Sequence, residues 1–151
     1  VLALFATRLF SGHPILHYED GGQLKDYIFV DDIVRANMIA METDAADGVV
    51  FNLGSGQPYT IRQVAEKLRA LINPELEIVC TGQYRASDSR HGWADISLAK
   101  KYLGWVPEVC FDDGLDELVE WLRTLPDAVI SEAVENFQEA ERYAESLGMA
   151  L

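Results

Sequence analysis

Apolar residues recur every three or four positions in several stretches of the chain, a spacing that places them on one face of an α-helix. A capping-box pattern begins at Thr60, and Ser97 and Gly104 are suited to cap the two ends of a shorter helix. Asp31 or Asp32 is expected to cap another. The predicted helices cover 1–10, 32–43, 60–71, 98–103, 111–123 and 128–147.

Short runs of β-branched, aromatic and aliphatic residues lie between these helices and predict strands. Glycine-containing stretches predict a turn over 19–22 and a loop over 54–59. The expected strands are 15–18, 25–30, 49–53 and 77–80. Because strands and helices are mixed without the strict alternation of βαβ units, the predicted fold class is mixed α/β.

Charge and composition narrow the range of partners. The 151 residues carry a formal net charge of −13, and 111–151 holds 11 acidic but only two basic side chains. Such a surface repels phosphate backbones and anionic lipids, so neither nucleic acid nor a membrane is expected as a partner. No apolar run approaches the roughly 18–20 residues that span a bilayer. Cys80 and Cys110 lack metal-ligand spacing and are expected to be reduced and buried in a cytoplasmic protein.

A polar stretch follows residue 84. Arg85, Asp88, Arg90 and His91 fall within seven residues, separated mainly by small side chains, in a pattern unlike a strand or a helix interior. A guanidinium can bind a phosphate or carboxylate through two parallel hydrogen bonds, so two arginines here indicate an anionic ligand. The alternative is a solvated loop whose arginines pair with nearby acids, because such surface pairs are common.

Three blocks of the sequence resemble one protein family, in the same order. They read GGQLKDYIFVDD at 21–32, VFNLGSG at 50–56 and RASDSRHGWADISLAKKYLGWVP at 85–107. They are similar to the D-G-x-Q-x-R-D-[FYW]-[IV]-x-V-x-D, F-N-[IV]-G-[ST]-G and R-x-x-D-x-R-H-x-x-A-D-x-x-x-A-x-x-x-L-G-W-x-P segments of NAD-dependent nucleotide-sugar epimerases and dehydratases. These enzymes are extended short-chain dehydrogenase/reductase proteins.

The resemblance implies the C-terminal, substrate-binding part of such an enzyme. Residues 1–125 would form that part, as a small mixed α/β domain, and 126–151 would be an acidic helical extension. Strand 49–53 and helix 33–43 would complete a Rossmann-like domain that is missing from this chain, whose start at Val1 suggests a fragment or a processed chain. An unpaired strand edge or apolar patch is therefore expected, covered by the missing N-terminal half or by self-association.

The residues that carry out the hydride chemistry of the resembled family are absent from this sequence. No Tyr-x-x-x-Lys pair occurs, so no catalytic residue is expected in this chain. Gly54 and Gly56 lie between a predicted strand and helix, but Tyr59 stands where a dinucleotide fingerprint needs its third glycine. NAD is expected in the full-length enzyme but not on this chain alone. No metal site is predicted.

Substrate-binding residues follow from motif position in the resembled family. They are Tyr18, Lys25, Asn52, Arg85, Asp88 and Arg90. Arg85 and Lys25 would bind the diphosphate of a nucleotide sugar, although lysine lacks the fork of the arginine usual at that position. Tyr18 would stack near the nucleobase or is an ordinary strand aromatic. Asn52 would bond the ligand or only its loop, and Asp88 would hold Arg85 or touch the sugar.

Three interpretations of function stay open. The first is the nucleotide-sugar-binding portion of an epimerase, inactive alone. A dehydratase or decarboxylase is its alternative, because these blocks bind the nucleotide and not the reacting carbons. The second is a stand-alone, non-enzymatic nucleotide-binding module. The third is an interaction protein that docks through the helix at 128–147. His91 follows Arg90 in the R-H pair of the family segment and is expected to anchor its loop, with a catalytic base as the alternative.

Overall fold

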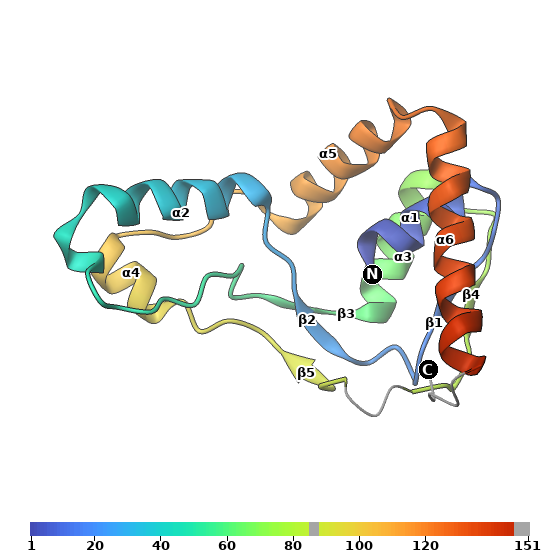
Figure 1. The fold of residues 1–151 in the computed structure, drawn as a ribbon, viewed down its shortest axis with the longest axis horizontal. Helices are drawn as coiled ribbons and strands as arrows, with labels where there is room; N and C mark the ends of the chain where they lie inside the picture. The colour runs from blue at the N-terminus through green and yellow to red at the C-terminus, as the bar shows by residue number, and fades with distance from the viewer. Residues whose placement is uncertain (85–87, 147–151) are drawn as a thin grey trace. The chain divides into compact units, whose positions relative to one another are not determined.

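The structure is a computed structural model that describes residues 1–84 and 88–146. It confirms the mixed α/β class (Figure 1). In chain order the elements are α1 (Leu2–Phe10), β1 (Ile15–His17), β2 (Leu24–Asp26), α2 (Val30–Glu42), the 3₁₀ turn η1 (Asp44–Ala46), β3 (Pro58–Thr60), α3 (Ile61–Ile72), β4 (Ile78–Cys80), β5 (His91–Gly92), α4 (Ser97–Leu103), α5 (Phe111–Arg123) and α6 (Asp127–Ser146).

The chain divides into two compact units that interleave along the sequence. Unit 1 comprises Val1–Gln23, Thr60–Arg90 and Asp116–Leu151. Unit 2 comprises Leu24–Tyr59 and His91–Leu115.

Unit 1 is built on a pair of parallel strands, β1 and β4, in which Ile15 lies opposite Ile78. Helix α1 packs against α3 and α6, and all three are close together in Figure 1. The buried apolar side chains come from β1 and the helices: Phe5, Ala6, Leu9, Ile15, Ile61, Val64, Ala65, Leu68, Val119, Leu122, Ile130 and Val134. This core holds β1 in place, and Tyr18 directly follows the C-terminal end of β1.

Helix α3 illustrates how sequence fixes a boundary in unit 1. Thr60 Oγ1 accepts a hydrogen bond from the Gln63 amide at 3.1 Å, and Gln63 Oε1 accepts one from the Thr60 amide at 2.8 Å. The predicted capping box is therefore confirmed. The buried side chains of α3 recur at helical spacing, so a single face enters the core.

Helix α6 packs on α1 in unit 1 and buries Ile130 and Val134, which belong to the apolar stripe predicted for 128–147. Phe137 of the same stripe is exposed. Within the part of the chain that the structure describes, no helix has both the length and the apolar character needed to cross a membrane.

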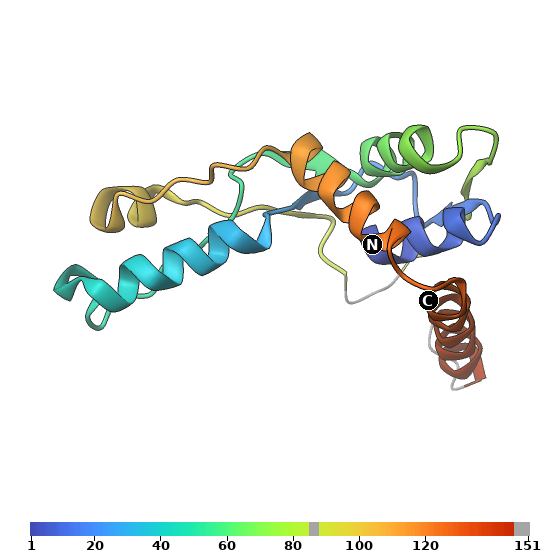
Figure 2. The same ribbon diagram turned by 90° about the horizontal axis from the view of Figure 1, so that it is seen from above.

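Unit 2 contains a three-stranded sheet in the order β3-β2-β5, with β2 and β5 parallel and Leu24 opposite His91. Helices α2 and α4 contact each other, and the course of both can be followed in Figures 1 and 2. Ala36, Ala99 and Trp105 are the buried centre of this unit. Partly buried apolar residues surround them: Ile28, Ile39, Phe51, Leu53, Ile96 and Leu103.

The second predicted strand, 25–30, is too long. β2 ends at Asp26, and Val30 already begins α2. Neither predicted aspartate caps α2, because its N-cap is Phe29 and no side chain bonds that end. Asp32 lies inside the first turn, and its carboxylate instead binds backbone amides of 108–109. Contacts far away in sequence thus override the local capping preference.

The strand predicted over 49–53 is wrong, since this segment pairs with no strand among the described residues. Val50 is 86% exposed. The run is apolar enough for a buried strand, but a strand needs a neighbour to pair with. The expected apolar patch is confirmed on α2, where Val30, Val34, Met38 and Met41 are all exposed along one face.

Several smaller expectations also need correction. Residues 58–60 form β3, whereas 54–59 was expected to be a loop. Ser97 is the first residue of α4 and Ile96 is its N-cap, while Gly104 closes the helix in the left-handed conformation with φ +63°, as predicted. Both Cys80 and Cys110 are free thiols, but they are exposed rather than buried.

Candidate functional site

The sequence-predicted binding residues are divided between the two units. Tyr18, Asp88 and Arg90 belong to unit 1, whereas Lys25 and Asn52 belong to unit 2. Arg85 lies outside the described residues. Each unit therefore has to be considered by itself.

In unit 1, Arg90 is held by the acidic turn that follows β1. Its guanidinium pairs with the Glu19 carboxylate and lies 2.7 Å from Asp20 Oδ2. The Arg90 hydrogen bond, with a second from the Gly22 amide, lowers the pKa of Asp20 to about 2. Arg90 is thus paired with acids, as the alternative expected, but these acids are 71 and 70 residues away in sequence and are not local. An anionic ligand would have to compete with two carboxylates.

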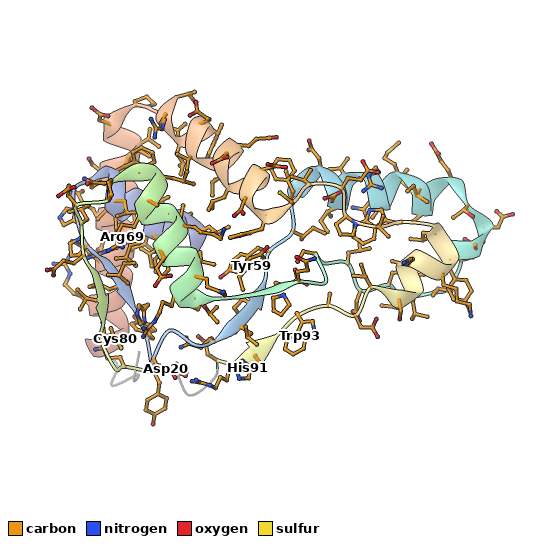
Figure 3. The ribbon with its side chains drawn as sticks, turned by 180° about the vertical axis from the view of Figure 1, so that it is seen from behind. Asp20, Tyr59, Arg69, Cys80, His91 and Trp93 are labelled. Carbon is orange, nitrogen blue, oxygen red and sulfur yellow. The ribbon has the colours of Figure 1, made fainter. Side chains whose placement is uncertain are left out.

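The same turn is fixed by backbone contacts. Arg62 Nη2 donates to the Asp20 carbonyl at 2.8 Å. The Glu19 carbonyl lies 2.7 Å from Cys80 Sγ on β4, and Figure 3 shows Asp20 and Cys80 at this end of the strand pair. Gly21 has φ +73°, and a Cβ there would lie 2.8 Å from the buried His17 ring. The backbone that follows Tyr18 therefore has little freedom.

Tyr18 and Asp88 differ in how firmly they are held. Tyr18 is partly buried, and its carbonyl accepts from Gln23 Nε2 at 3.1 Å and from the Gly21 amide at 3.3 Å. Asp88 is exposed, and its carboxylate has no hydrogen-bond partner within the described ranges 1–84 and 88–146.

In unit 2, Lys25 lies at the middle of β2 and is paired in register with Gly92 of β5. His91 Nδ1 accepts from the Leu24 amide at 3.3 Å, which confirms the expected loop-anchoring role. Asn52 is exposed, and its side chain forms no hydrogen bond with any residue that the structure describes. The structure therefore shows no anchoring of its own loop by this side chain.

The most heavily bonded group in this part of unit 2 is Asp26, which the sequence analysis did not single out. Its Oδ1 accepts from the Ser55 amide at 2.8 Å and from Ser55 Oγ at 2.5 Å. Its Oδ2 accepts from the Ala94 amide at 3.0 Å and from the Gly56 amide at 3.4 Å. One carboxylate thus joins all three motif blocks of the sequence.

The electrostatics and packing around Asp26 favour the ionised form of its carboxylate. Burial alone would raise the pKa of Asp26, but the hydrogen bonds from Ser55, Ala94 and Gly56 outweigh it and hold the pKa below its usual value. A Cβ on Gly54 would lie 2.4 Å from Asp26 Oδ2 and 2.5 Å from the Ala94 Cβ. Glycine is therefore required at 54 by close approach. The available sequence signal was an acid inside a strand-forming run.

The Gly54–Gly56 turn does not fit the phosphate loop of a dinucleotide. Such a loop offers unpaired backbone amides to the phosphate, but the Ser55 and Gly56 amides already donate to Asp26. The helix that follows, α3, is closed by its own capping box at Thr60. No group of His, Cys, Asp and Glu suited to a metal ion occurs among the described residues either.

Another carboxylate in unit 2, the buried Asp32, holds the tryptophan of the L-G-W-x-P motif in place. It accepts from the Glu108 and Val109 amides at 2.9 and 3.1 Å and from Arg35 Nη2 at 2.6 Å. Its backbone carbonyl accepts from Trp105 Nε1 at 3.0 Å. Burial would raise the pKa of Asp32, but these amides and Arg35 lower it. This network stabilises the fold of unit 2.

Aromatic side chains pack beside β2 in unit 2. The Phe111 ring centroid lies 4.3 Å from that of Tyr59 and 5.4 Å from that of Tyr27. The Tyr27 hydroxyl is buried and has no hydrogen-bond partner among the described residues. Burial raises the pKa of Tyr27 to about 12, so this group stays a neutral phenol.

Comparisons with known proteins identify the source of these shared motifs. Residues 2–118 match the family model described as GDP-mannose 4,6 dehydratase. The UDP-glucuronate 4-epimerase of Thermodesulfobacterium geofontis is 34% identical over 118 residues, which cover 78% of this chain and 36% of that protein. The UDP-glucuronic acid decarboxylase 1 of Arabidopsis thaliana is 31% identical over 123 residues, covering 82% of this chain and 28% of that protein.

A solved structure agrees with these relatives. The UDP-glucose 4-epimerase of Thermotoga maritima, determined with UDP-glucose, superposes with a TM-score of 0.75 at 37% identity, covering 81% of this chain and 38% of that one. The chain thus spans between about a quarter and two-fifths of the length of these proteins. Since the family model matches most of its residues, the chain belongs to the NAD-dependent nucleotide-sugar epimerases and dehydratases of the extended short-chain dehydrogenase/reductase family.

Proposed function

We propose that this chain is the nucleotide-sugar-binding portion of an NAD-dependent nucleotide-sugar epimerase. Residues 1–125 form that portion, and 126–151 form an acidic helical extension. The observation that carries the proposal is the convergence of the three family motif blocks on Asp26 in unit 2, with Lys25 beside it and Asn52 exposed nearby in sequence. Because the three motif blocks meet at one carboxylate, we expect them to bind one ligand together.

The proposed ligand contacts include positive side chains that match the negative charge of a diphosphate. Lys25 supplies a compact positive charge from β2, and Arg85 supplies a forked donor. A charged hydrogen bond of this kind contributes about 1.5–3 kcal/mol. Asn52 offers both a donor and an acceptor. Tyr18 stacks on the nucleobase.

Asp88 and Arg90 complete the proposed set from the loop before β5. Asp88 is exposed and orients Arg85 or contacts the sugar. Arg90 holds the Glu19–Asp20 turn and exchanges these carboxylates for ligand oxygens when the ligand is bound. The exchange keeps a charged partner on Arg90 in both states.

The chain binds and orients the substrate, and the hydride chemistry belongs to other residues of the full enzyme. NAD supplies that hydride chemistry when it is bound. The turn at 54–56 does not fit the cofactor phosphates, and no Tyr-x-x-x-Lys pair occurs in the sequence. We therefore assign no catalytic residue to this chain and expect it to be inactive alone.

The exposed apolar face of α2 is the proposed contact with the N-terminal half of the enzyme. Val34 and Met41 are exposed on this face, and Val50 lies in the unpaired segment 49–53. Self-association is the alternative way to cover the patch.

The two free thiols agree with a reducing compartment, and we propose a cytoplasmic location.

A sugar-nucleotide dehydratase or decarboxylase is the second candidate, and the similarity to the Arabidopsis decarboxylase is compatible with it. The experiment that separates the candidates incubates the protein expressed from its complete reading frame with NAD and UDP-glucuronate or UDP-glucose. Nuclear magnetic resonance then identifies the product. A C4 epimer supports the proposal, and released carbon dioxide or a dehydrated sugar supports the alternative.

A stand-alone, non-enzymatic module is tested by titration calorimetry. UDP-glucose and UDP should both bind, whereas glucose should not, because the proposed contacts are to the nucleotide diphosphate. Binding without turnover by the complete protein would favour the module. Absence of binding by every nucleotide diphosphate would remove the proposed function.

A further inference from the structure

Asp26 joins segments of unit 2 that lie far apart in sequence. Ser55 is 29 residues and Ala94 is 68 residues away from it, and both donate backbone hydrogen bonds to its carboxylate. We infer that Asp26 is a positioning residue of the nucleotide-sugar site, which holds the segments carrying Lys25 and Asn52 in the arrangement that binds the ligand. The inference rests on the proposed function.

The hydrogen-bond geometry requires both oxygens of an ionised carboxylate. Oδ1 accepts two bonds from Ser55, and Oδ2 accepts from the Ala94 and Gly56 amides. An asparagine could accept on one side only, and its NH₂ group would then face amide donors on the other. Asp26→Asn therefore changes the hydrogen bonding with almost no change in volume.

Asp26 and its hydrogen-bond partners lie close in sequence to the proposed ligand contacts. It directly follows Lys25 on β2, and Ser55 lies three residues after Asn52. Ala94 lies two residues after Gly92, which is the register partner of Lys25. β2 has three residues and β5 has two, so the strand ladder supplies few bonds to set these positions. The carboxylate supplies the bonds that the short ladder lacks.

Asp26 lies outside the buried centre of its unit. That centre consists of Ala36, Ala99 and Trp105, and Asp26 itself is only partly buried. Loss of the carboxylate should therefore loosen the two loops beside β2 while the centre stays packed. This predicts a larger effect on ligand affinity than on folding.

The test measures the affinity for UDP-glucose by titration calorimetry for the wild type, Asp26→Asn and Asp31→Asn. Asp31 is an exposed aspartate on α2 and serves as the matched control. We expect Asp26→Asn to weaken binding by about tenfold, on the scale of one charged hydrogen bond, and Asp31→Asn to leave it unchanged. The near-ultraviolet circular dichroism of Asp26→Asn should match that of the wild type.

A double-mutant cycle separates positioning from general destabilisation. If Asp26 acts through Lys25, then Asp26→Asn should weaken binding much less in a Lys25→Ala background than in the wild type. Equal effects in both backgrounds would overturn the inference. Ser55→Ala, which removes one bond to Oδ1, gives the same comparison if Asp26→Asn does not fold.

Failure of the proposed function gives a different result from failure of the inference. A wild type that binds no nucleotide diphosphate would overturn both. A wild type that binds UDP-glucose, together with an Asp26→Asn variant of equal affinity, would overturn only the role of Asp26.

Discussion

Replacement of Asp32 by alanine is expected to destabilise the chain severely. Asp32 is 2% exposed, and its carboxylate accepts hydrogen bonds from the Glu108 and Val109 amides and from Arg35. Alanine removes the acceptor for all three donors and leaves the Glu108 and Val109 amides without the partner they have in the folded chain. It also removes the anion that neutralises the Arg35 guanidinium.

The magnitude follows from the donors that lose their acceptor. A buried donor left unpaired costs about 1–3 kcal/mol, and breaking a buried ion pair costs about 3–5 kcal/mol. Arg35 keeps its bond to the Val106 carbonyl and its contact with Glu108, and its side chain is 30% exposed, so its share is reduced. Asp32→Ala should therefore lower the free energy of unfolding by about 3–4 kcal/mol. The exposed neighbour Asp31→Ala should change it by less than about 0.5 kcal/mol.

Urea denaturation followed by tryptophan fluorescence measures this difference, because Trp105 is buried beside the network. The pKa of Asp32 is lowered in the folded state, so its stabilisation is present above the unfolded pKa of about 3.9 and is lost as pH falls through the folded pKa. The wild type and Asp32→Ala should differ fully at pH 7 and converge below about pH 4. A loss under about 1 kcal/mol at pH 7 would refute the reasoning.

Three further substitutions test other parts of the structure by thermal or urea denaturation. Gly54→Ala should destabilise by about 1–3 kcal/mol, because the new Cβ would lie 2.4 Å from Asp26 Oδ2, and a neutral effect would contradict the close approach. Thr60→Ala should cost about 1 kcal/mol through loss of the α3 cap, and unchanged stability would show that the cap is dispensable. Tyr27→Phe should stabilise by about 1 kcal/mol, because it removes a buried hydroxyl without a partner among the described residues, and destabilisation would reveal a missing acceptor.

The sequence predicted elements well where local chemistry decides them. The Thr60 capping box, the bounds of α5 at Phe111 and Arg123, and the glycine closure at Gly104 depend on residues a few positions apart. The strand predicted over 49–53 does not form. An apolar run becomes a strand only when a neighbouring strand pairs with it, and none does among the described residues. Periodicity predicts what a segment can form, while partners decide what it does form.

The candidate site was predictable only in part. Motif position indicated Lys25 and Asn52, and His91 was expected to anchor its loop. The sequence could not show that Asp26 and Asp32 bind backbone amides 68 to 77 residues away, because such contacts depend on the tertiary fold. Nor could it show that Arg90 is held by Glu19 and Asp20, which are 71 and 70 residues away in sequence.

The most direct test of the central claim is the affinity of Lys25→Ala for UDP-glucose, measured by titration calorimetry beside the wild type and Lys100→Ala. Lys100 is an exposed lysine on α4 and controls for the loss of one positive charge. The account predicts saturable binding by the wild type and by Lys100→Ala, and binding weakened about tenfold or more in Lys25→Ala. Equal affinities for the two variants, or no binding of UDP-glucose by the wild type, would contradict it.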